Sequence, residues 1–330
     1  MSDEIDSGFE HGRTPVGLEH RQTPVGLEHD PLEQLEAGPI FIVGHIRSGT
    51  TWVLDVLTAH PEVAGLFESL IFTGNGLAAP LRPMHWNPDG SRDMFEREMG
   101  LGQILERDEV IADLSELASR WLARALEPQH RYLVEKTPAD ASAVETLATL
   151  FPDACVIHVL RDGRDVAVST MAAQHTWQRR GKENAPPPIS SRHLWQIGLR
   201  WARQVASLRQ QALTLPLPFY EVRYEDMHAK PRETARELFD FCGIPIEDAL
   251  VDEILERTHF SQLPRTGPEE FRRAGRVGDW RRQWSHVERL LFTAAAGEVL
   301  EQTGYAGPAP KRAQQARELL MRYEKAKRFM

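Results

Sequence analysis

The chain has 330 residues, of which 41% are hydrophobic and 26% charged, as in a globular protein with one large domain or two small ones. The net charge of −9 argues against a nucleic-acid partner, and no apolar run approaches the ~20 residues that span a membrane. The acidic, polar start of the chain is unlike a signal peptide, and the two cysteines lie in apolar surroundings typical of buried thiols. We therefore expect a cytoplasmic protein.

Residues 1–38 carry a nine-residue repeat. Residues 18–26 echo residues 9–17, and a third copy begins at Leu27. Because each full copy contains proline and glycine and the period is short, these repeats cannot build a packed core. We expect a disordered tail, with the docking of a partner as its candidate role.

From residue 39 onward, short apolar runs alternate with helical patterns. Strands are expected at 40–43, 63–67, 132–134, 154–160 and 219–222. Helices are expected after Gly49 and at 94–107, 110–126, 139–150, 162–171, 191–213, 231–242 and 286–302. Irregular segments separate them at 73–93 and at 178–191, where three consecutive prolines exclude a helix and the position suggests a lid.

This alternation predicts an α/β fold with a mostly parallel sheet flanked by helices. We assign one domain to residues 39–306. A basic amphipathic helix at 307–330 lies outside the main pattern. The second strand is expected to lie beside the first, so that their carboxyl ends open onto one crevice.

The stretch from Gly44 to Trp52 joins the first strand to the first helix. Gly44 and Gly49 have the spacing of the first half of a Walker A loop, but Thr50 stands where that motif has lysine. Arg47 supplies a cation from inside the loop instead. The N–H groups of such a loop and the positive end of the helix dipole converge on one point, which predicts an anion site.

The whole run G-H-I-R-S-G-T-T-W resembles the 5′-phosphosulfate loop of sulfotransferases that use 3′-phosphoadenosine 5′-phosphosulfate (PAPS). The resemblance extends over residues 39–285. It is closest to tyrosylprotein-type and bacterial sulfotransferases, with adenine-binding motifs of the cytosolic type. It implies a P-loop-containing sulfotransferase fold. The residues that it assigns to the cofactor here are Arg47, Ser48, Gly49, Thr50, Thr51 and Trp52, the last stacking on the purine.

The resemblance also implies a reaction. A sulfuryl group moves from PAPS to an acceptor hydroxyl, and adenosine 3′,5′-bisphosphate is left as product. No metal is required, because fixed cations can stabilise a transferred group of little net charge. The acceptor is a small molecule, a glycan or a peptide, and the sequence does not distinguish these.

Further along the chain, Arg161 and Ser169 form a candidate phosphate clamp. Arg161 ends a strand and Ser169 lies two helical turns later, so both can face one side. A charge cluster at a helix start, with no ligand, is the alternative. In the family the matching pair holds the 3′-phosphate. Tyr224 resembles a tyrosine near the adenine, and Thr258 and Phe260 resemble a threonine–aromatic pair that packs on it.

Residues 273–280 resemble the segment R-K-G-x-x-G-D-W that closes over the 3′-phosphate in the family. Here alanine stands at 274 in place of the family lysine, and Arg272 or Arg276 are candidates to compensate. Only Arg273 and Gly275 are therefore expected to contact the nucleotide.

The expected chemistry needs cations at the leaving phosphate and a base at the acceptor. Arg47 is one cation, and Lys136 matches a lysine that contacts the sulfuryl group in tyrosylprotein sulfotransferases. The histidine base of the cytosolic enzymes is missing, because Pro138 stands at its position. Glu68 falls where tyrosylprotein- and heparan-type enzymes carry a glutamate base. The alternatives are that Glu68 only pairs with a cation, or that a histidine such as His85 is the base.

Two other functions compete with sulfuryl transfer. A P-loop kinase or phosphotransferase needs a Walker lysine and a carboxylate that holds Mg²⁺. Thr50 replaces the first, and the clearest strand ends in Arg161, an anion binder. A non-catalytic adapter that keeps the nucleotide pocket is suggested by the repeats. The presence of Arg47, Glu68 and Lys136 argues against it.

Overall fold

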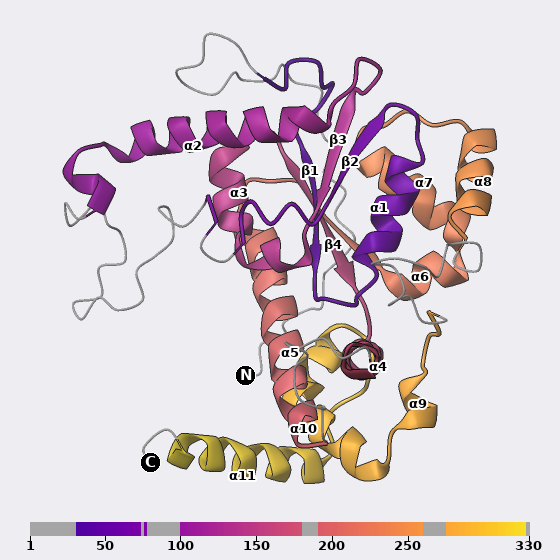
Figure 1. Cartoon of the computed structure of the whole chain (residues 1–330). Coiled ribbons are helices and arrows are strands. Elements are labelled where there is room, and N and C mark those ends of the chain that lie inside the picture. Colours follow the sequence, from indigo (N-terminus) through magenta and orange to yellow (C-terminus); the bar gives the residue numbers. More distant parts are fainter. Residues whose placement is uncertain (1–30, 74–75, 78–99, 180–190, 260–274, 328–330) are drawn as a thin grey trace, which may run out of the picture.

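A computed structural model describes residues 31–73, 76–77, 100–179, 191–259 and 275–327 (Figure 1). Its five parallel strands lie in the order β2-β3-β1-β4-β5. They are β1 (Ile40–Gly44), β2 (Val63–Phe67), β3 (Tyr132–Lys136), β4 (Cys155–Leu160) and β5 (Phe219–Arg223). The predicted α/β fold and parallel sheet are confirmed. The prediction that the second strand lies directly beside the first is wrong, because β3 pairs with both β1 and β2 and lies between them.

Helices cover both faces of the sheet and one end of it. They are α1 (Thr50–Thr58), α2 (Arg107–Leu122), α3 (Val144–Leu150), α4 (Gly163–Arg179), α5 (Ser191–Thr214), α6 (Tyr224–Ala229), α7 (Pro231–Phe241), α8 (Asp248–Arg257), α9 (Trp280–Gln283), α10 (His286–Gln302) and α11 (Lys311–Lys327). The helix expected at 139–150 is divided into a 3₁₀ turn, Pro138–Ser142, and α3. Of the helix expected at 94–107, the described part contains the 3₁₀ turn Gly100–Gln103.

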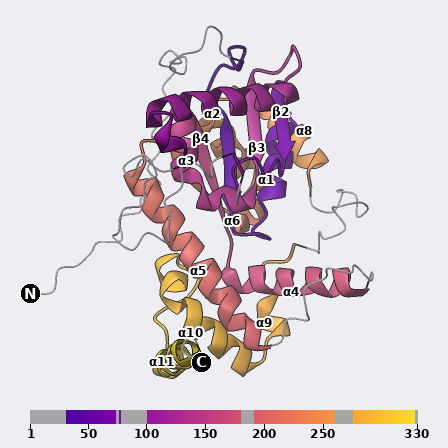
Figure 2. The ribbon, with the colours of Figure 1, turned by 60° about the vertical axis from the view of Figure 1, so that its left-hand side comes forward.

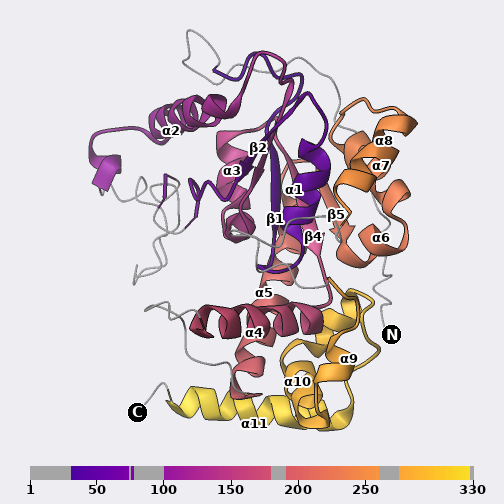
Figure 3. The same cartoon turned by 45° about the vertical axis from the view of Figure 1, so that its right-hand side comes forward.

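Strand β1 is buried on both faces, as its apolar run predicts. Ile40 and Ile42 pack in a cluster with α1, α7 and α8. Phe41 and Val43 point the other way and pack with α2 and α3. Figure 3 shows α1, α6, α7 and α8 on one side of the sheet and α2 and α3 on the other. The loop that follows β1 therefore leaves a strand fixed from two directions.

A separate layer of helices lies beyond the end of β4 and comprises α4, α9, α10, α11 and part of α5 (Figure 2). The C-terminal helix belongs to this layer, because Ala313 of α11 is completely buried against Trp195 of α5 and residues of α10. None of the described helices is long and apolar enough to cross a membrane.

Residues 31–38, which the sequence assigns to the tail, lie against the core. Leu32 and Leu35 are 1% and 4% exposed. The side-chain amide of Gln34 donates to the carbonyl oxygens of Glu127 and His130 at 3.0 and 3.1 Å. The packed part of the chain therefore begins before residue 39. The rest of the repeat segment, residues 1–30, lies outside the described residues. Both cysteines are free and buried, as expected.

Candidate active site

The loop between β1 and α1 has a backbone that suits an anion. Arg47 and Gly49 both have positive φ angles, of 71° and 106°. A Cβ atom added to Gly49 would lie 2.4 Å from the ring of Tyr224, so the position requires glycine. Among the described residues no side chain caps the start of α1, which leaves its first N–H groups available to a ligand.

Three predicted cofactor residues meet at this loop. Arg161 follows β4 and donates from Nη1 to the carbonyl oxygen of Arg47 at 3.2 Å. Arg47 donates from Nε to the hydroxyl of Ser169, on α4, at 3.2 Å. The residues are 114 and 122 positions apart in the chain, and the fold brings them into one cluster.

The cluster concentrates positive charge in a buried place. Burial and the charge of Arg161 lower the pKa of Arg47, while Tyr224 and Glu68 act in the opposite direction. The hydroxyl of Ser48 and the Nε of Arg161 are buried and have no hydrogen-bond partner among the described residues. Two guanidinium groups and two unpartnered polar atoms in one cluster fit an anionic ligand. Such a ligand would offset the repulsion between the cations and would give the two polar atoms a hydrogen-bond partner.

Aromatic side chains border the cationic cluster. The guanidinium of Arg161 lies 4.0 Å above the ring of Tyr224, and the hydroxyl of Tyr224 donates to the carbonyl oxygen of Gly275 at 2.9 Å. Trp52 is 7% exposed and contacts Tyr224 edge-on, with ring centroids 5.7 Å apart. The ring of His228, which sequence reasoning did not single out, is 4.7 Å from that of Trp52. These rings form the side of the site where a nucleobase is expected.

Thr258 supports this aromatic group through its backbone. Its carbonyl oxygen accepts a hydrogen bond from Nε1 of Trp52 at 3.1 Å. Its hydroxyl donates to the carbonyl oxygen of Ile254, within α8. Thr258 therefore fixes the orientation of Trp52. Phe260, the other member of the predicted pair, lies outside the described residues.

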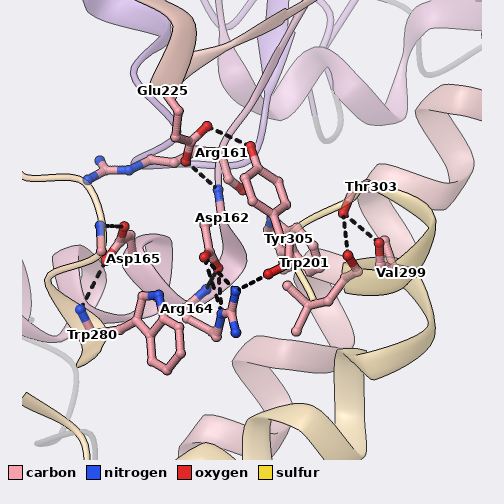
Figure 4. A network of polar contacts seen from close by, with 12 residues as sticks. Arg161, Asp162, Arg164, Asp165, Trp201, Glu225, Trp280, Val299, Thr303 and Tyr305 are labelled. Carbon is pink, nitrogen blue, oxygen red and sulfur yellow. Dashed lines mark hydrogen bonds and ion pairs between the residues drawn. The ribbon is translucent and has the colours of Figure 1, made fainter. Parts of the chain in front are cut away.

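The segment around Gly275 is held to the start of α4 by Asp165 (Figure 4). The carboxylate of Asp165 accepts from the backbone N–H groups of Gly278 and Trp280 at 2.6 and 3.0 Å. Arg161 donates to the carbonyl oxygen of Arg276 in the same segment at 3.4 Å. The predicted closing segment is thus next to the predicted phosphate clamp. Arg273 lies outside the described residues.

We expect Asp165→Asn to weaken the binding of adenosine 3′,5′-bisphosphate by roughly three- to tenfold. The amide of asparagine would oppose one of the two N–H groups, which removes a hydrogen bond worth about 0.5–1.5 kcal/mol. Isothermal titration of both proteins measures the difference. Asp113→Asn, at an exposed position on α2, is the control. Unchanged affinity in Asp165→Asn would mean that the closing segment stays in place without this carboxylate.

Residues 161–164, at the junction of β4 and α4, are also braced from the C-terminal side (Figure 4). The N–H of Asp162 donates to Glu225, whose other carboxylate oxygen accepts from the hydroxyl of Tyr305 at 2.6 Å. Arg164 binds the carboxylate of Asp162 and the carbonyl oxygen of Tyr305. These contacts fix the direction in which Arg161 leaves the sheet.

The predicted catalytic carboxylate and lysine form an ion pair at the ends of β2 and β3. Lys136 Nζ lies 2.8 Å from Oε1 of Glu68 and 3.6 Å from the ring centroid of Phe67. The side chain of Lys136 is completely buried, whereas that of Glu68 is 43% exposed. Burial lowers the pKa of Lys136, and the hydrogen bond and charge of Glu68 oppose this change. A carboxylate that only neutralises Lys136 would make the same contact, so the role of Glu68 as a base stays a prediction.

Sequence reasoning missed two carboxylates near the site, Asp165 and Glu135. Asp165 lies four residues after Arg161, a spacing that places both on one side of a helix start. Glu135 is a charged residue inside an apolar strand pattern, which is itself a sign of a buried partner. The alternative base, His85, lies outside the described residues.

Comparison with known proteins gives the family. Residues 39–248 match the model of the "Sulfotransferase family". The match covers more than half of the chain, and the chain therefore belongs to the sulfotransferase family. This membership does not favour the alternatives of a P-loop kinase or an adapter.

Individual relatives are distant. Protein-tyrosine sulfotransferase 1 of Danio rerio is 29% identical over 212 residues, which cover 64% of this chain and 55% of the relative. Nodulation protein NoeE of Sinorhizobium fredii is 25% identical over 283 residues, covering 80% of this chain and 65% of the relative. The chain thus spans less than two thirds of either. A solved structure of mouse sulfotransferase SULT7A1 complexed with PAP is 17% identical, with a TM-score of 0.49 over 83% of this chain and 92% of that one.

Proposed function

We propose that this protein transfers a sulfuryl group from PAPS to an acceptor hydroxyl. The observation that carries the proposal is the cluster that Arg47, in a loop with positive φ angles, forms with Arg161 and Ser169, in a member of the sulfotransferase family. A donor with a 5′-phosphosulfate and a 3′-phosphate offers anions to both parts of this cluster. The buried Lys136 beside Glu68 adds the cation and the carboxylate that the reaction needs.

The residues of the site divide into three groups by the part of the donor they would hold. The loop residues Arg47, Ser48, Gly49, Thr50 and Thr51 would bind the 5′-phosphosulfate, and Trp52, just after them, would stack on the purine. The 3′-phosphate would be held by Arg161, Ser169, Arg273 and Gly275. The adenine would lie against Tyr224, Thr258 and Phe260. The unpartnered Ser48 hydroxyl and Arg161 Nε support this fit, since both can donate to phosphate oxygens.

The chain contributes a base and two cations to the reaction. When bound, PAPS supplies the sulfuryl group, and adenosine 3′,5′-bisphosphate is its leaving group. Glu68 accepts the proton of the acceptor hydroxyl, using a side chain that is partly open to the outside. Lys136 and Arg47 stabilise the charge that develops on the leaving phosphate. Because both cations belong to the protein, the proposed reaction proceeds without a metal.

The acceptor is one of three classes: a small molecule, a glycan or a peptide. Transfer of label from [³⁵S]PAPS to p-nitrophenol, to a tyrosine-containing peptide and to an oligosaccharide distinguishes them. The assay is run with EDTA, so that any dependence on a metal is detected. Turnover with none of the three, by a protein that binds the nucleotide, would favour a non-catalytic role.

Binding of the nucleotide is tested separately by thermal unfolding. Adenosine 3′,5′-bisphosphate should raise the melting temperature without Mg²⁺, and saturation at ~100 times Kd corresponds to about 2.7 kcal/mol of added stability. AMP and ATP should have little effect, because neither carries a 3′-phosphate for Arg161 and Ser169. Equal stabilisation by AMP would rule out the 3′-phosphate clamp.

A further inference from the structure

The turn that follows β2 has an uncommon backbone. Glu68 and Leu70 have φ angles of 49° and 57°, and neither is glycine. L-residues other than asparagine and aspartate rarely adopt this left-handed conformation, because the side chain is crowded against the backbone. Such a conformation persists where the surroundings hold it in place. The contacts that hold this turn therefore also determine where the Glu68 carboxylate lies.

Those contacts come from the end of β3. Ser69, the residue between the two left-handed positions, donates from its backbone N–H and its hydroxyl to Oε1 of Glu135, at 3.1 and 2.8 Å. The backbone N–H of Glu68 donates to the carbonyl oxygen of Lys136 at 2.8 Å. Two neighbouring residues of β3 thus hold the turn through these three hydrogen bonds, in addition to the ion pair between Lys136 and Glu68.

The burial of Glu135 is unfavourable for the free energy of folding. It is completely buried, and its Oε2 has no hydrogen-bond partner among the described residues. Its Oε1 accepts a third hydrogen bond, from the hydroxyl of Thr137 at 2.6 Å. An apolar side chain there would avoid the cost of burying a carboxylate. The hydrogen bonds to Ser69 supply a reason for a carboxylate at this place.

We propose that Glu135 is a positioning residue, which holds the Glu68–Leu70 turn through Ser69 and so places the Glu68 carboxylate against Lys136. The inference rests on the proposed function, in which Glu68 and Lys136 act on the acceptor and the leaving group. Because Glu135 is completely buried, we assign it no contact with the donor or the acceptor. It acts through the geometry of the turn and through its charge.

The carboxyl group of Glu135 also acts on Lys136. Burial raises the pKa of Glu135, whereas the hydrogen bonds from Thr137 and Ser69 and the charge of Lys136 oppose this change. Burial lowers the pKa of that lysine, and the carboxylates of Glu68, Glu135 and Asp55 oppose the change. They approach from the turn after β2, from β3 and from α1. Removing one negative charge should therefore lower the pKa of Lys136 further. The basic limb of the pH profile of kcat, where Lys136 loses its proton, would then move to lower pH.

The first variant is Ser69→Ala, which removes one of the hydrogen bonds between the turn and Glu135. We expect kcat to fall at least tenfold, because small displacements of a catalytic group have large effects, while the KM for PAPS stays within about twofold. Ser115→Ala is the matched control, since Ser115 is a buried serine of α2 whose hydroxyl donates to the carbonyl oxygen of Leu150 at 2.7 Å. It should keep kcat while losing a similar amount of stability.

The second variant is Glu135→Gln, measured with the acceptor that gives turnover in the panel above. A basic limb displaced to lower pH, with lower kcat and unchanged KM for PAPS, supports the proposal. A purely structural role would lower the melting temperature and leave the pH profile in place, and that result overturns it.

Glu68→Gln, run in parallel, separates this inference from the proposed function. If Glu68→Gln is inactive while Ser69→Ala turns over at the wild-type rate, the positioning role alone is wrong. If Glu68→Gln itself keeps wild-type turnover, the assignment of the base is wrong, and the inference that rests on it fails as well.

Discussion

Glu68→Gln is expected to lower turnover by roughly 10²–10⁴-fold, the contribution typical of a general base. Glutamine keeps the shape of the side chain and can still accept a hydrogen bond from Lys136, so the pocket is preserved. It cannot take a proton from the acceptor. The affinity for adenosine 3′,5′-bisphosphate should barely change, because the cluster of Arg47, Arg161 and Ser169 that would bind the nucleotide is untouched.

Steady-state turnover with [³⁵S]PAPS, together with titration of the nucleotide, measures both quantities. Glu145→Gln, at an exposed position in the first turn of α3, controls for the loss of one negative charge. Retention of more than about a tenth of the wild-type turnover, with chemistry still rate-limiting, would place the base elsewhere. His85 would then be the next residue to replace.

Arg161→Lys should weaken the binding of adenosine 3′,5′-bisphosphate by roughly 10–150-fold, the equivalent of one charged hydrogen bond of about 1.5–3 kcal/mol. Lysine keeps the charge but loses the planar fork. That fork reaches the carbonyl oxygens of Arg47 and Arg276 while it covers the ring of Tyr224. An ammonium cannot make these contacts and also present two parallel N–H groups to a phosphate.

Calorimetric titration of the nucleotide provides the measurement, and AMP provides a second ligand. The affinity for AMP should be nearly the same in wild type and variant, because AMP lacks the 3′-phosphate. Arg203→Lys, an exposed substitution on α5, is the matched control. If Arg161→Lys weakens the binding of AMP as much as that of the bisphosphate, the role of Arg161 is to maintain the fold of the site and not to bind the 3′-phosphate.

Local patterns predicted the parts of the site that depend on one strand and its loop. The unbroken apolar run from Ile40 to Val43 indicated a strand buried on both faces, and Gly49 indicated a helix start open to an anion. Arg161 and Ser169 could be paired because they lie on one strand–helix unit. The structure brings Arg47 to them because β1 and β4 are neighbours in the sheet.

Features that depend on the order of strands could not be predicted. The apolar sequences of β1 and β2 do not indicate that β3 lies between them in the sheet. The hydrogen bonds between Glu135 and Ser69 depend on that position of β3. Similarly, the burial of Leu32 and Leu35 depends on the shape of the core, and the repeats gave no sign of it. Both cases involve contacts between distant segments, which periodicity does not encode.

The bracing of residues 161–165, where β4 meets α4, has a consequence for the synthesis of the chain. The N–H of Gly278 binds Asp165 across 113 positions, and the carbonyl oxygen of Tyr305 binds Arg164 across 141. A ribosome releases the sheet, the anion loop and Arg161 long before it releases these partners. The contacts that brace this side of the site can therefore form only after residue 305 has left the ribosome, when the sheet and the anion loop have already been synthesised.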